Sequence, residues 1–393
     1  MAGVRDRDAS VSGLRGAAAV VGVAEAGLGV APAGCTPLEL MAMATADALD
    51  DCGLKLSDID AVFSASAYYP MPHLNLAEYL GIRPRYNDGT NGGGSSFESH
   101  LLHATAAISA GLCEVALIAY GSTQRSDSGR LKSVSEPSPY ELPYGPQHPV
   151  SMYALAAARH MHQYGTTRTQ LAEVAVAARK WAALTPAAFM RDPLTVDDVI
   201  ASRLVSSPLR VRDCCLVTDG AGAVIVTSKA RARDLDVTPA WFLGGGEATT
   251  HKFISAMPDL TVTAAEASGR RAFEMAGLTP ADVDVVELYD AFTIATILFL
   301  EDLGFCEKGE GGAFVSDGAI APGGRLPVNT HGGGLSYTHP GMYGIFIIIE
   351  AARQLRGVRA ENLPRKPDVA LVHGNGGVLS SQATILLGSD AAL

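Results

Sequence analysis

Apolar and polar positions form alternating blocks along the chain, and these blocks predict strands separated by helices. Segments such as "TPLELMAMATADALDDCGL" carry apolar residues at helical spacing. Strands that are apolar throughout and alternate with helices predict an α/β protein whose sheet is covered on both faces. The predicted strands are six short apolar runs bounded by turns: "AAAVVGVA", "DAVFSAS", "VALIAYG", "GAVIVTS", "VDVVEL" and "VALVHG".

The chain repeats this pattern once. Residues 43–66 and 266–290 both read as a helix, a glycine stop, a short turn and a β-rich strand. Gly53 matches Gly277, and Asp60 matches Asp284 at the same offset. A glycine turn that opens a second helix also occurs once in each half, as "NGGGSS" and as "HGGG". We therefore predict two pseudo-repeated halves stacked in a five-layer α-β-α-β-α sandwich with shared central helices.

The predicted halves span residues 16–235 and 236–393. Residues 122–210 interrupt the first half with prolines, several arginines and helix-like patches. Two interpretations of this insertion stay open, a cap over the active site and a plain helical excursion. Residues 1–15 are polar, lack the apolar core of a signal peptide, and are predicted to be a disordered tail.

Composition narrows the range of partners. The formal charge of −11 and the absence of a basic run disfavour nucleic acid, because phosphate neutralisation needs clustered Lys and Arg. The six cysteines are scattered and form no C-x-x-C pair, which predicts no zinc site in this chain and a reducing cytoplasm. The apolar runs are too short to span a bilayer, so no membrane association is expected.

The stretch "NTHGGGLSYTHPGMYG", residues 329–344, places histidines and tyrosines on a glycine-rich turn ahead of an apolar helical run. Reactive side chains on such a turn are typical of a functional site. Together with "GGGSSFESHLLHATAAISAGLCEVALIAYG", "DCCLVTDGAGAVIVTS", "VDVVELYDAF" and "HGNGG", it makes residues 16–390 resemble the thiolase superfamily. The resemblance is strongest to the sterol-carrier-protein-type thiolase branch.

The resemblance implies four catalytic loops, and this chain departs from them at one essential position. The nucleophilic cysteine of the family falls at Gly94 or Ser95, where there is no cysteine. Tyr289 stands where the family has the Asn or His of its oxyanion hole. The "THP" histidine is His339, and the last loop carries His373.

Without a thiolate to take the acyl group, transfer through an acyl-enzyme is disfavoured. Donors that stabilise a thioester oxyanion would equally stabilise an enolate, so carbon–carbon cleavage beside a thioester remains feasible. The chain is similar to the cysteine-less, thiolase-like aldolases of bacterial steroid degradation. That similarity implies retro-aldol cleavage of a β-hydroxyacyl-CoA to a ketone or aldehyde plus acetyl- or propionyl-CoA. It also implies that Tyr289 and Tyr337 carry protons.

The same similarity implies partners. We expect a homodimer that binds a small zinc-ribbon and OB-fold protein as a heterotetramer, with zinc only in that partner and no cofactor in this chain. The predicted catalytic residues are Tyr289, Tyr337, His339 and His373. The predicted substrate-binding residues are Gly94, Ser95, Asp290, His331, Gly333 and Gly376, among which Ser95 is expected to cap its helix and Asp290 to support the tyrosine loop.

Two other functions stay open. One is a divergent thiolase or acyl-CoA acyltransferase that uses a serine or a displaced cysteine. The other is a catalytically silent thiolase fold that binds acyl-CoA or scaffolds a partner. The missing cysteine separates the first from an aldolase, whereas the coexistence of His339, Tyr289 and Tyr337 on loops argues against the second.

Overall fold

A computed structural model describes residues 12–129, 138–358, 363 and 365–393. Within them the main sheet has nine strands in the order β3-β2-β4-β7-β1-β8-β11-β10-β9. The N-terminal half supplies β1 (Ala18–Gly29), β2 (Ala61–Ser64), β3 (Tyr86–Asp88), β4 (Val115–Ser122) and β7 (Asp219–Ser228). The C-terminal half supplies β8 (Ala240–Thr249), β9 (Val285–Leu288), β10 (Val369–Gly376) and β11 (Ser381–Gly388).

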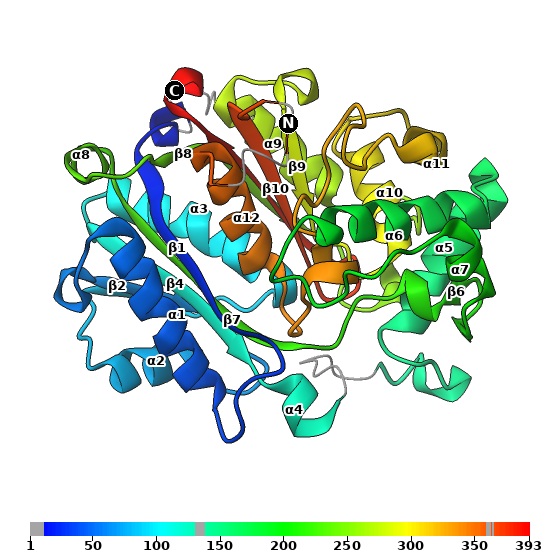
Figure 1. Cartoon of the computed structure of the whole chain (residues 1–393), viewed down its shortest axis with the longest axis horizontal. Coiled ribbons are helices and arrows are strands. Elements are labelled where there is room, and N and C mark those ends of the chain that lie inside the picture. Colours follow the sequence, from blue (N-terminus) through cyan, green and yellow to red (C-terminus); the bar gives the residue numbers. More distant parts are fainter. Residues whose placement is uncertain (1–11, 130–137, 359–362, 364) are drawn as a thin grey trace, which may run out of the picture.

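Within this strand order, the N-terminal and C-terminal halves are joined only by a short pairing of β1 with β8. β1 pairs with β8 at two positions, Ala19 with Trp241 and Val20 with Ala240. Two central helices, α3 (Ser96–Ser109) and α12 (Gly344–Arg356), contact strands of both halves. α1 (Pro37–Cys52) covers the outer face of the first half, beside α2 (Pro72–Leu80), and α9 (Ala265–Ala276) covers β8 and β11. The predicted five layers are confirmed (Figure 1).

The internal repeat has an atomic basis. Gly53 and Gly277 both end their helices in the left-handed conformation, with φ of 69° and 64°, which a glycine adopts without a steric penalty. The carboxylate of Asp60 accepts the backbone N–H groups of Glu114 and Val115 at the start of β4. The carboxylate of Asp284 does the same for Asp368 and Val369 at the start of β10. The matched residues therefore perform the same task in both halves.

The sequence pattern missed three strands of the main sheet, namely β3, β8 and β11. β8 contains three consecutive glycines, Gly244 to Gly246, which break the run of large apolar residues that marks a strand. These glycines are required by packing, since a Cβ atom at Gly244 would overlap the carbonyl oxygen of Ala272 in α9. The small residues bring α9 close to the sheet, and this close approach is invisible in the hydrophobic pattern alone.

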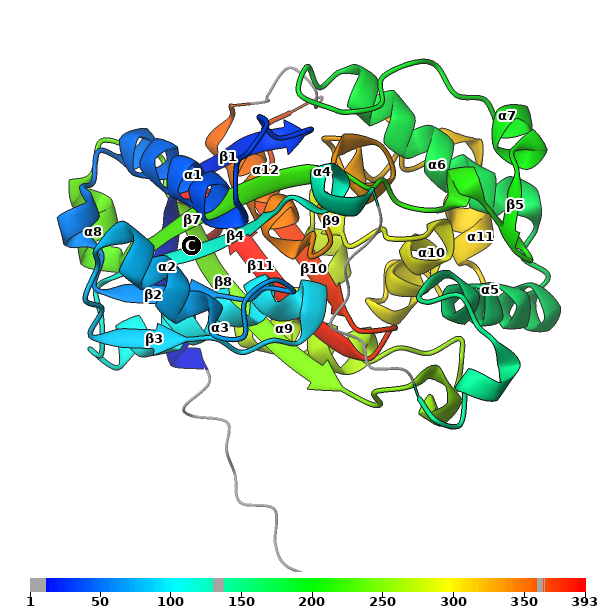
Figure 2. The ribbon, with the colours of Figure 1, turned by 90° about the horizontal axis from the view of Figure 1, so that it is seen from below.

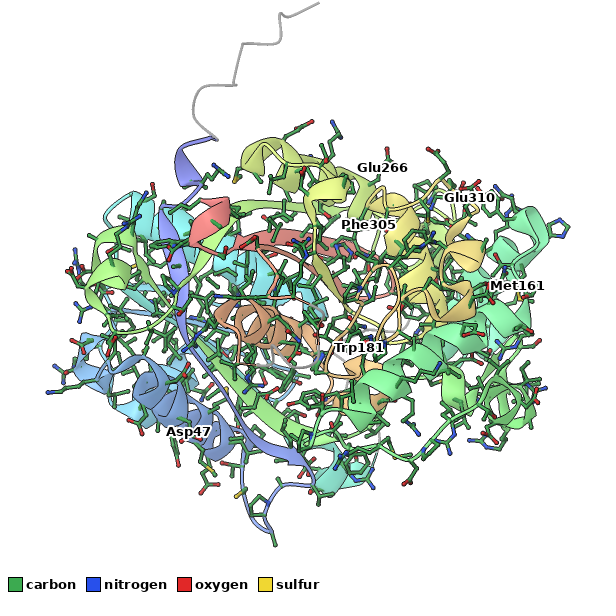
Figure 3. All side chains as sticks on the ribbon, turned by 45° about the horizontal axis from the view of Figure 1, so that its top comes forward. Asp47, Met161, Trp181, Glu266, Phe305 and Glu310 are labelled. Atoms are coloured by element: carbon green, nitrogen blue, oxygen red, sulfur yellow. The ribbon has the colours of Figure 1, made fainter. Side chains whose placement is uncertain are left out.

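The insertion lies beside the C-terminal half. It contains α4 (Gln124–Ser128), α5 (Val150–Tyr164), α6 (Arg168–Ala183), α7 (Val196–Ala201) and the short pair β5 (Leu204–Ser206) and β6 (Leu209–Arg210). α5 and α6 contact α10 (Thr293–Asp302), and α6 also contacts α11 (Gly311–Phe314), an arrangement seen from below in Figure 2. Trp181, labelled in Figure 3, donates from α6 to the carbonyl of Ile320 at 2.9 Å. The insertion is thus anchored by side-chain packing, and the division of the chain into domains stays a prediction.

The predicted disordered tail, residues 1–15, is contradicted at residues 12–15. Residues 1–11 lie outside the described residues, but Ser12–Leu14 form a 3-10 helix. The guanidinium of Arg15 donates to the carbonyls of Ala392 and Leu393, which fixes this end of the chain to the other. After β7 the chain continues through α8 (Lys229–Asp234) into β8. Among the described residues, no helix combines the length and apolarity needed to cross a bilayer.

Candidate active site

Both central helices begin at one cavity of about 350 Å³. Gly92 to Gly94 precede α3, and His339 to Met342 precede α12, so the positive ends of two helix dipoles point at the same space. Helix N-termini favour developing negative charge nearby. The remaining walls come from the insertion and from the segments that follow β3, β8 and β9, precede β7, and join β10 to β11. Their residues are Asn91, His148, Pro149, Tyr153, Cys215, His251, Lys252, Tyr289, Ala291, Phe292, Asn375, Gly377, Val378, Ser380 and Ser381.

The ring of Tyr289 fills the place that a side chain at position 94 would need. A Cβ atom on Gly94 would overlap the Tyr289 ring and would lie 2.6 Å from the carbonyl oxygen of Asn375. Real Cβ atoms essentially never approach other heavy atoms so closely. A nucleophilic side chain at Gly94 and a tyrosine at 289 therefore exclude each other. Position 94, one of the two positions that the resemblance gives for the nucleophile, therefore has no room for a side chain beside Tyr289.

Ser95 does not replace the nucleophile. Its hydroxyl has one proton to donate, either to Ser381 Oγ at 3.0 Å or to the carbonyl of Gly92 at 3.4 Å, and the residue is absent from the cavity lining. No histidine contacts it within the described residues. The prediction that Ser95 caps α3 is wrong, because its side chain makes no capping bond. Ser96 Oγ instead accepts the backbone N–H of Gly92 and donates to Gly93, which fixes the glycine turn.

His339 lies at the cavity, as predicted for a catalytic histidine. It is 2 % exposed, and within the described residues neither ring nitrogen has a hydrogen-bond partner. Its backbone is held at both ends, since its N–H donates to Thr218 Oγ1 and its carbonyl accepts from Gln124 Nε2. Burial lowers the pKa of His339 to about 4. At neutral pH the imidazole therefore offers one lone pair and one N–H to a ligand.

Tyr289 also lines the cavity, and its ring meets His339 edge-on with centroids 5.6 Å apart. Its hydroxyl donates to the carbonyl of Gly341 at 2.8 Å and accepts the backbone N–H of Tyr343 at 3.2 Å. Burial raises its pKa well above the usual 10. Tyr289 is thus a neutral phenol that acts as a hydrogen-bond donor, not a base.

The structure does not bring Tyr337 to the cavity. Its hydroxyl donates to Glu25 Oε2 at 2.7 Å, and Glu25 also pairs with Arg353. Its ring packs on Ala182, Ala188 and Leu28. The reason is local, because residues Gly333–Tyr337 form a π-helical turn that carries Tyr337 back toward β1. The "LSY" motif predicted a loop residue but could not give its direction, and the structure does not place Tyr337 where the predicted catalytic role would need it.

His373 is a second prediction that the geometry contradicts. Its ring is fully buried between Thr384 Oγ1 and Gln382 Oε1, both at 2.8 Å, and it does not line the cavity. Burial lowers its pKa to about 3. The side chain that does reach the cavity from "HGNGG" is Asn375, two residues further along β10. His373 therefore contacts Thr384 and Gln382 behind the cavity wall and does not reach the cavity itself.

The other predicted binding residues shape the loops without lining the cavity. Asp290 accepts the N–H of Gly334 at 2.6 Å, and burial raises its pKa to about 7. A Cβ on Gly333 would overlap that carboxyl group, so Asp290 holds this turn closely, in agreement with its predicted supporting role. His331 bonds the hydroxyl of Tyr343 at 2.8 Å. Gly376 lies against the carbonyl of Gly92, which joins the two glycine loops.

Cys215 is a cavity residue that the sequence reasoning missed as such. Its backbone N–H donates to Ala291, which places it beside the tyrosine loop. Burial raises the pKa of its thiol well above the usual 9, and the neighbouring Cys214 and Asp290 act in the same direction. A thiol that stays protonated is a poor nucleophile. Cys215 therefore lacks the activation that a displaced catalytic cysteine requires.

Only one group of potential metal ligands occurs within the described residues, namely Glu287, His331 and Glu350. Thr330 Oγ1 bonds both carboxyl groups, and burial, with the charge of Glu350 next, raises the pKa of Glu287. None of the three residues lines the cavity, so this cluster supports the fold behind the site.

Comparison with known proteins gives a consistent picture. Residues 246–389 match the thiolase C-terminal domain-like family. A 17-hydroxy-3-oxo-4-pregnene-20-carboxyl-CoA lyase of Mycobacterium tuberculosis is 35% identical, over 92% of this chain and 97% of its own length. An acetyl-CoA acetyltransferase of Methanothermobacter thermautotrophicus is 34% identical, over 84% and 88%. The solved Ltp2-ChsH2(DUF35) aldolase superposes with a TM-score of 0.87 at 32% identity, covering 96% of this chain and 99% of that one.

The contact between Gly94 and Tyr289 predicts strong coupling between these positions. Gly94→Ala should lower the free energy of unfolding by about 1–3 kcal/mol, the usual cost of overpacking a dense core. In a Tyr289→Ala background the same change should cost less, with a coupling energy above about 0.5 kcal/mol. Denaturant unfolding of the four proteins measures this cycle. Additive effects would show that the ring does not occupy the space at position 94.

Proposed function

Because the chain belongs to the thiolase superfamily, in its sterol-carrier-protein-type branch, we propose that it is a carbon–carbon lyase. It cleaves a bulky, steroid-derived β-hydroxyacyl-CoA by a retro-aldol reaction, and it releases a ketone or aldehyde and a short acyl-CoA such as acetyl- or propionyl-CoA. The observation that carries this proposal is the ring of Tyr289 in the space of the missing nucleophile. Sequence similarity alone extends to both a lyase and an acetyltransferase, so the cavity decides between them.

Acyl transfer has no nucleophile in this cavity. Gly94 has no side chain, Ser95 is hydrogen-bonded to Ser381 and does not line the cavity, and the thiol of Cys215 stays protonated. Retro-aldol cleavage needs no covalent intermediate. It needs a base for the β-hydroxyl proton, donors for the enolate oxygen, and an acid for the α-carbon.

His339 is the base in this proposal. Its imidazole is neutral at neutral pH, and its ring nitrogens have no protein partner among the described residues. As it takes the hydroxyl proton, the carbon–carbon bond breaks and the electron pair moves onto the thioester. Bonds to Thr218 and Gln124 fix the backbone of His339, so little reorganisation is needed.

Tyr289 stabilises the negative charge that arrives on the thioester oxygen. In the structure its hydroxyl donates a hydrogen bond to the carbonyl of Gly341. During the reaction the hydroxyl donates to the enolate oxygen instead. The N-termini of α3 and α12 reinforce this effect, since they place partial positive charge at the cavity. Apolar wall residues that would contact the bulky acyl group include Pro149, Phe292, Met342 and Val378.

We further propose that the active form is a homodimer that carries two copies of a small zinc-ribbon and OB-fold protein. The support is the Ltp2-ChsH2(DUF35) aldolase, in which a chain similar to this one is named together with a second protein. The zinc would belong to that partner and none to this chain. The proposed location is the cytoplasm, which the scattered free cysteines favour.

The reaction class is testable by its requirement for free CoA. The protein, alone and with its partner, should release a ketone or aldehyde from a bulky 3-hydroxyacyl-CoA with no CoA added. Product is followed by mass spectrometry, and intact-protein mass is recorded during turnover. Release that depends on added CoA, or an acyl adduct on the protein, would establish thiolysis instead. Tight binding of acyl-CoA without either reaction would identify a silent subunit.

Removal of the Tyr289 hydroxyl should be severe. Tyr289→Phe keeps the ring against Gly94 but loses a donor to the enolate, so kcat should fall by about 10²–10³-fold. Tyr337→Phe is the matched control, because its hydroxyl bonds Glu25 away from the cavity. That variant should keep kcat within about threefold and lower only the melting temperature. The opposite ranking of the two variants would reverse these assignments.

The pH profile tests His339 as the base. Its folded-state pKa is depressed to about 4, so the neutral form persists down to that pH and is lost only below it. We expect kcat/KM to stay level from pH 8 to about 5 and to fall with a midpoint near 4. Circular dichroism at each pH separates this loss from unfolding. A midpoint near 6.5, the ordinary pKa of histidine, would contradict the assignment of the buried His339 as the base.

A further inference from the structure

A retro-aldol cleavage needs a second proton transfer, in which an acid protonates the α-carbon of the departing acyl-CoA. The identity of that acid is inferred below, and the inference rests on the proposed function. The sequence offered Tyr289 and Tyr337 as the proton carriers without assigning either as acid or base, but the hydroxyl of Tyr337 is bound to Glu25 away from the cavity. Tyr289 donates its proton to Gly341 and is assigned to the thioester oxygen. Neither of these two tyrosines is therefore placed to protonate the carbon.

Tyr153 is the second tyrosine that lines the cavity, and it comes from α5 of the insertion. Its ring packs on Phe292 with centroids 4.3 Å apart, which fixes its position beside the tyrosine loop. Its oxygen accepts a hydrogen bond from Asn375 Nδ2 at 2.7 Å. No acceptor for the Tyr153 hydroxyl proton is found among the described residues. In this respect it differs from Tyr289, whose proton is already bonded.

A chain of buried side chains fixes the direction of that bond. Gln382 Nε2 donates to Asn375 Oδ1, so the Asn375 amide nitrogen faces Tyr153. Gln382 Oε1 can only accept, so His373 Nε2 donates to it. His373 Nδ1 then accepts from Thr384 Oγ1, which also bonds Ser268. The predicted catalytic His373 is a positioning residue that orients Asn375 through Gln382.

Burial raises the pKa of the Tyr153 phenol to about 12, while the side chain of Asn375 and then the backbone of Leu379 act in the opposite direction. Leu379 has a φ of 56°, a left-handed conformation that a branched residue rarely adopts. Such strained backbone concentrates at functional sites. Here it belongs to the turn between β10 and β11, which lines the cavity through Gly377, Val378 and Ser380.

We propose that Tyr153 is the general acid that protonates the α-carbon of the enolate after carbon–carbon cleavage. The Asn375 donor on its oxygen stabilises the phenolate that this transfer leaves, and its own proton has no acceptor among the residues that the structure describes. The insertion thereby supplies a catalytic residue to the cavity.

The proton balance closes. The β-hydroxyl proton passes to His339, the carbon–carbon electron pair becomes the enolate, and the Tyr153 proton forms the new C–H bond. The Tyr153 phenolate then regains a proton from solvent, and protonated His339 releases one. The net change is one proton moved from oxygen to carbon, with no oxidant, reductant or co-reactant.

Microscopic reversibility supplies a test that needs no steroid substrate. The acid that protonates the enolate carbon also removes the α-proton of the acyl-CoA product. The wild-type protein, with its partner where activity requires it, is incubated with propionyl-CoA in D₂O, and α-deuterium uptake is measured by mass spectrometry. Tyr153→Phe should slow the exchange at least about 100-fold. Tyr144→Phe, which changes an 87% exposed tyrosine of the same insertion, should leave it unchanged.

A second variant guards against a folding defect in Tyr153→Phe, which melting temperature and circular dichroism report. Asn375→Leu keeps the phenol but removes the Asn375 donor from its oxygen, so exchange should fall about tenfold and persist. Exchange by Tyr153→Phe within threefold of wild type would overturn the proposal. The proposal would also be overturned if the wild type cleaved the bulky 3-hydroxyacyl-CoA but exchanged no α-proton of propionyl-CoA. Absence of both cleavage and exchange in the wild type would instead overturn the proposed function.

Discussion

The contact of the Tyr289 ring with the backbone of Gly94 is the constraint on which the rest of the site depends. It removes the space for a nucleophile and puts a phenol at the cavity in the same step. Core positions this close cannot both carry large groups, because protein interiors are packed as densely as crystals. The chemistry therefore follows from packing, and the change from acyl transfer to bond cleavage needs no new fold.

The cavity exists because the two halves bring their glycine turns together. Gly376 lies against the carbonyl of Gly92, and the N-termini of α3 and α12 meet at this point. Any side chain at Gly376 would separate the loops, and the helix dipoles would no longer converge on one substrate. The pseudo-symmetry of the fold thus produces an electrostatic site at the junction of the repeats.

Behind the wall lies a layer of buried polar groups that do not touch the cavity. Asp290 holds the Gly333–Gly334 turn, His331 bonds Tyr343, and Gln382 joins His373 to Asn375. Buried polar groups are costly unless they are bonded, so this layer fixes a single arrangement of the loops in front of it. Its members share residue types with catalytic groups, and sequence motifs alone do not separate the two.

The sequence determined the alternation of strands and helices, the internal repeat and the loss of the cysteine, because these depend on local patterns and residue identity. It also placed His339 and Tyr289 at the cavity. It did not determine β3, β8 and β11, the directions of Tyr337 and His373, or the arrival of Tyr153 from the insertion. Those depend on side-chain direction within a π-helical turn and a strand, and on contacts between residues far apart in the chain. Only the tertiary structure decides such contacts, since a motif specifies which residues are present and not which way they point.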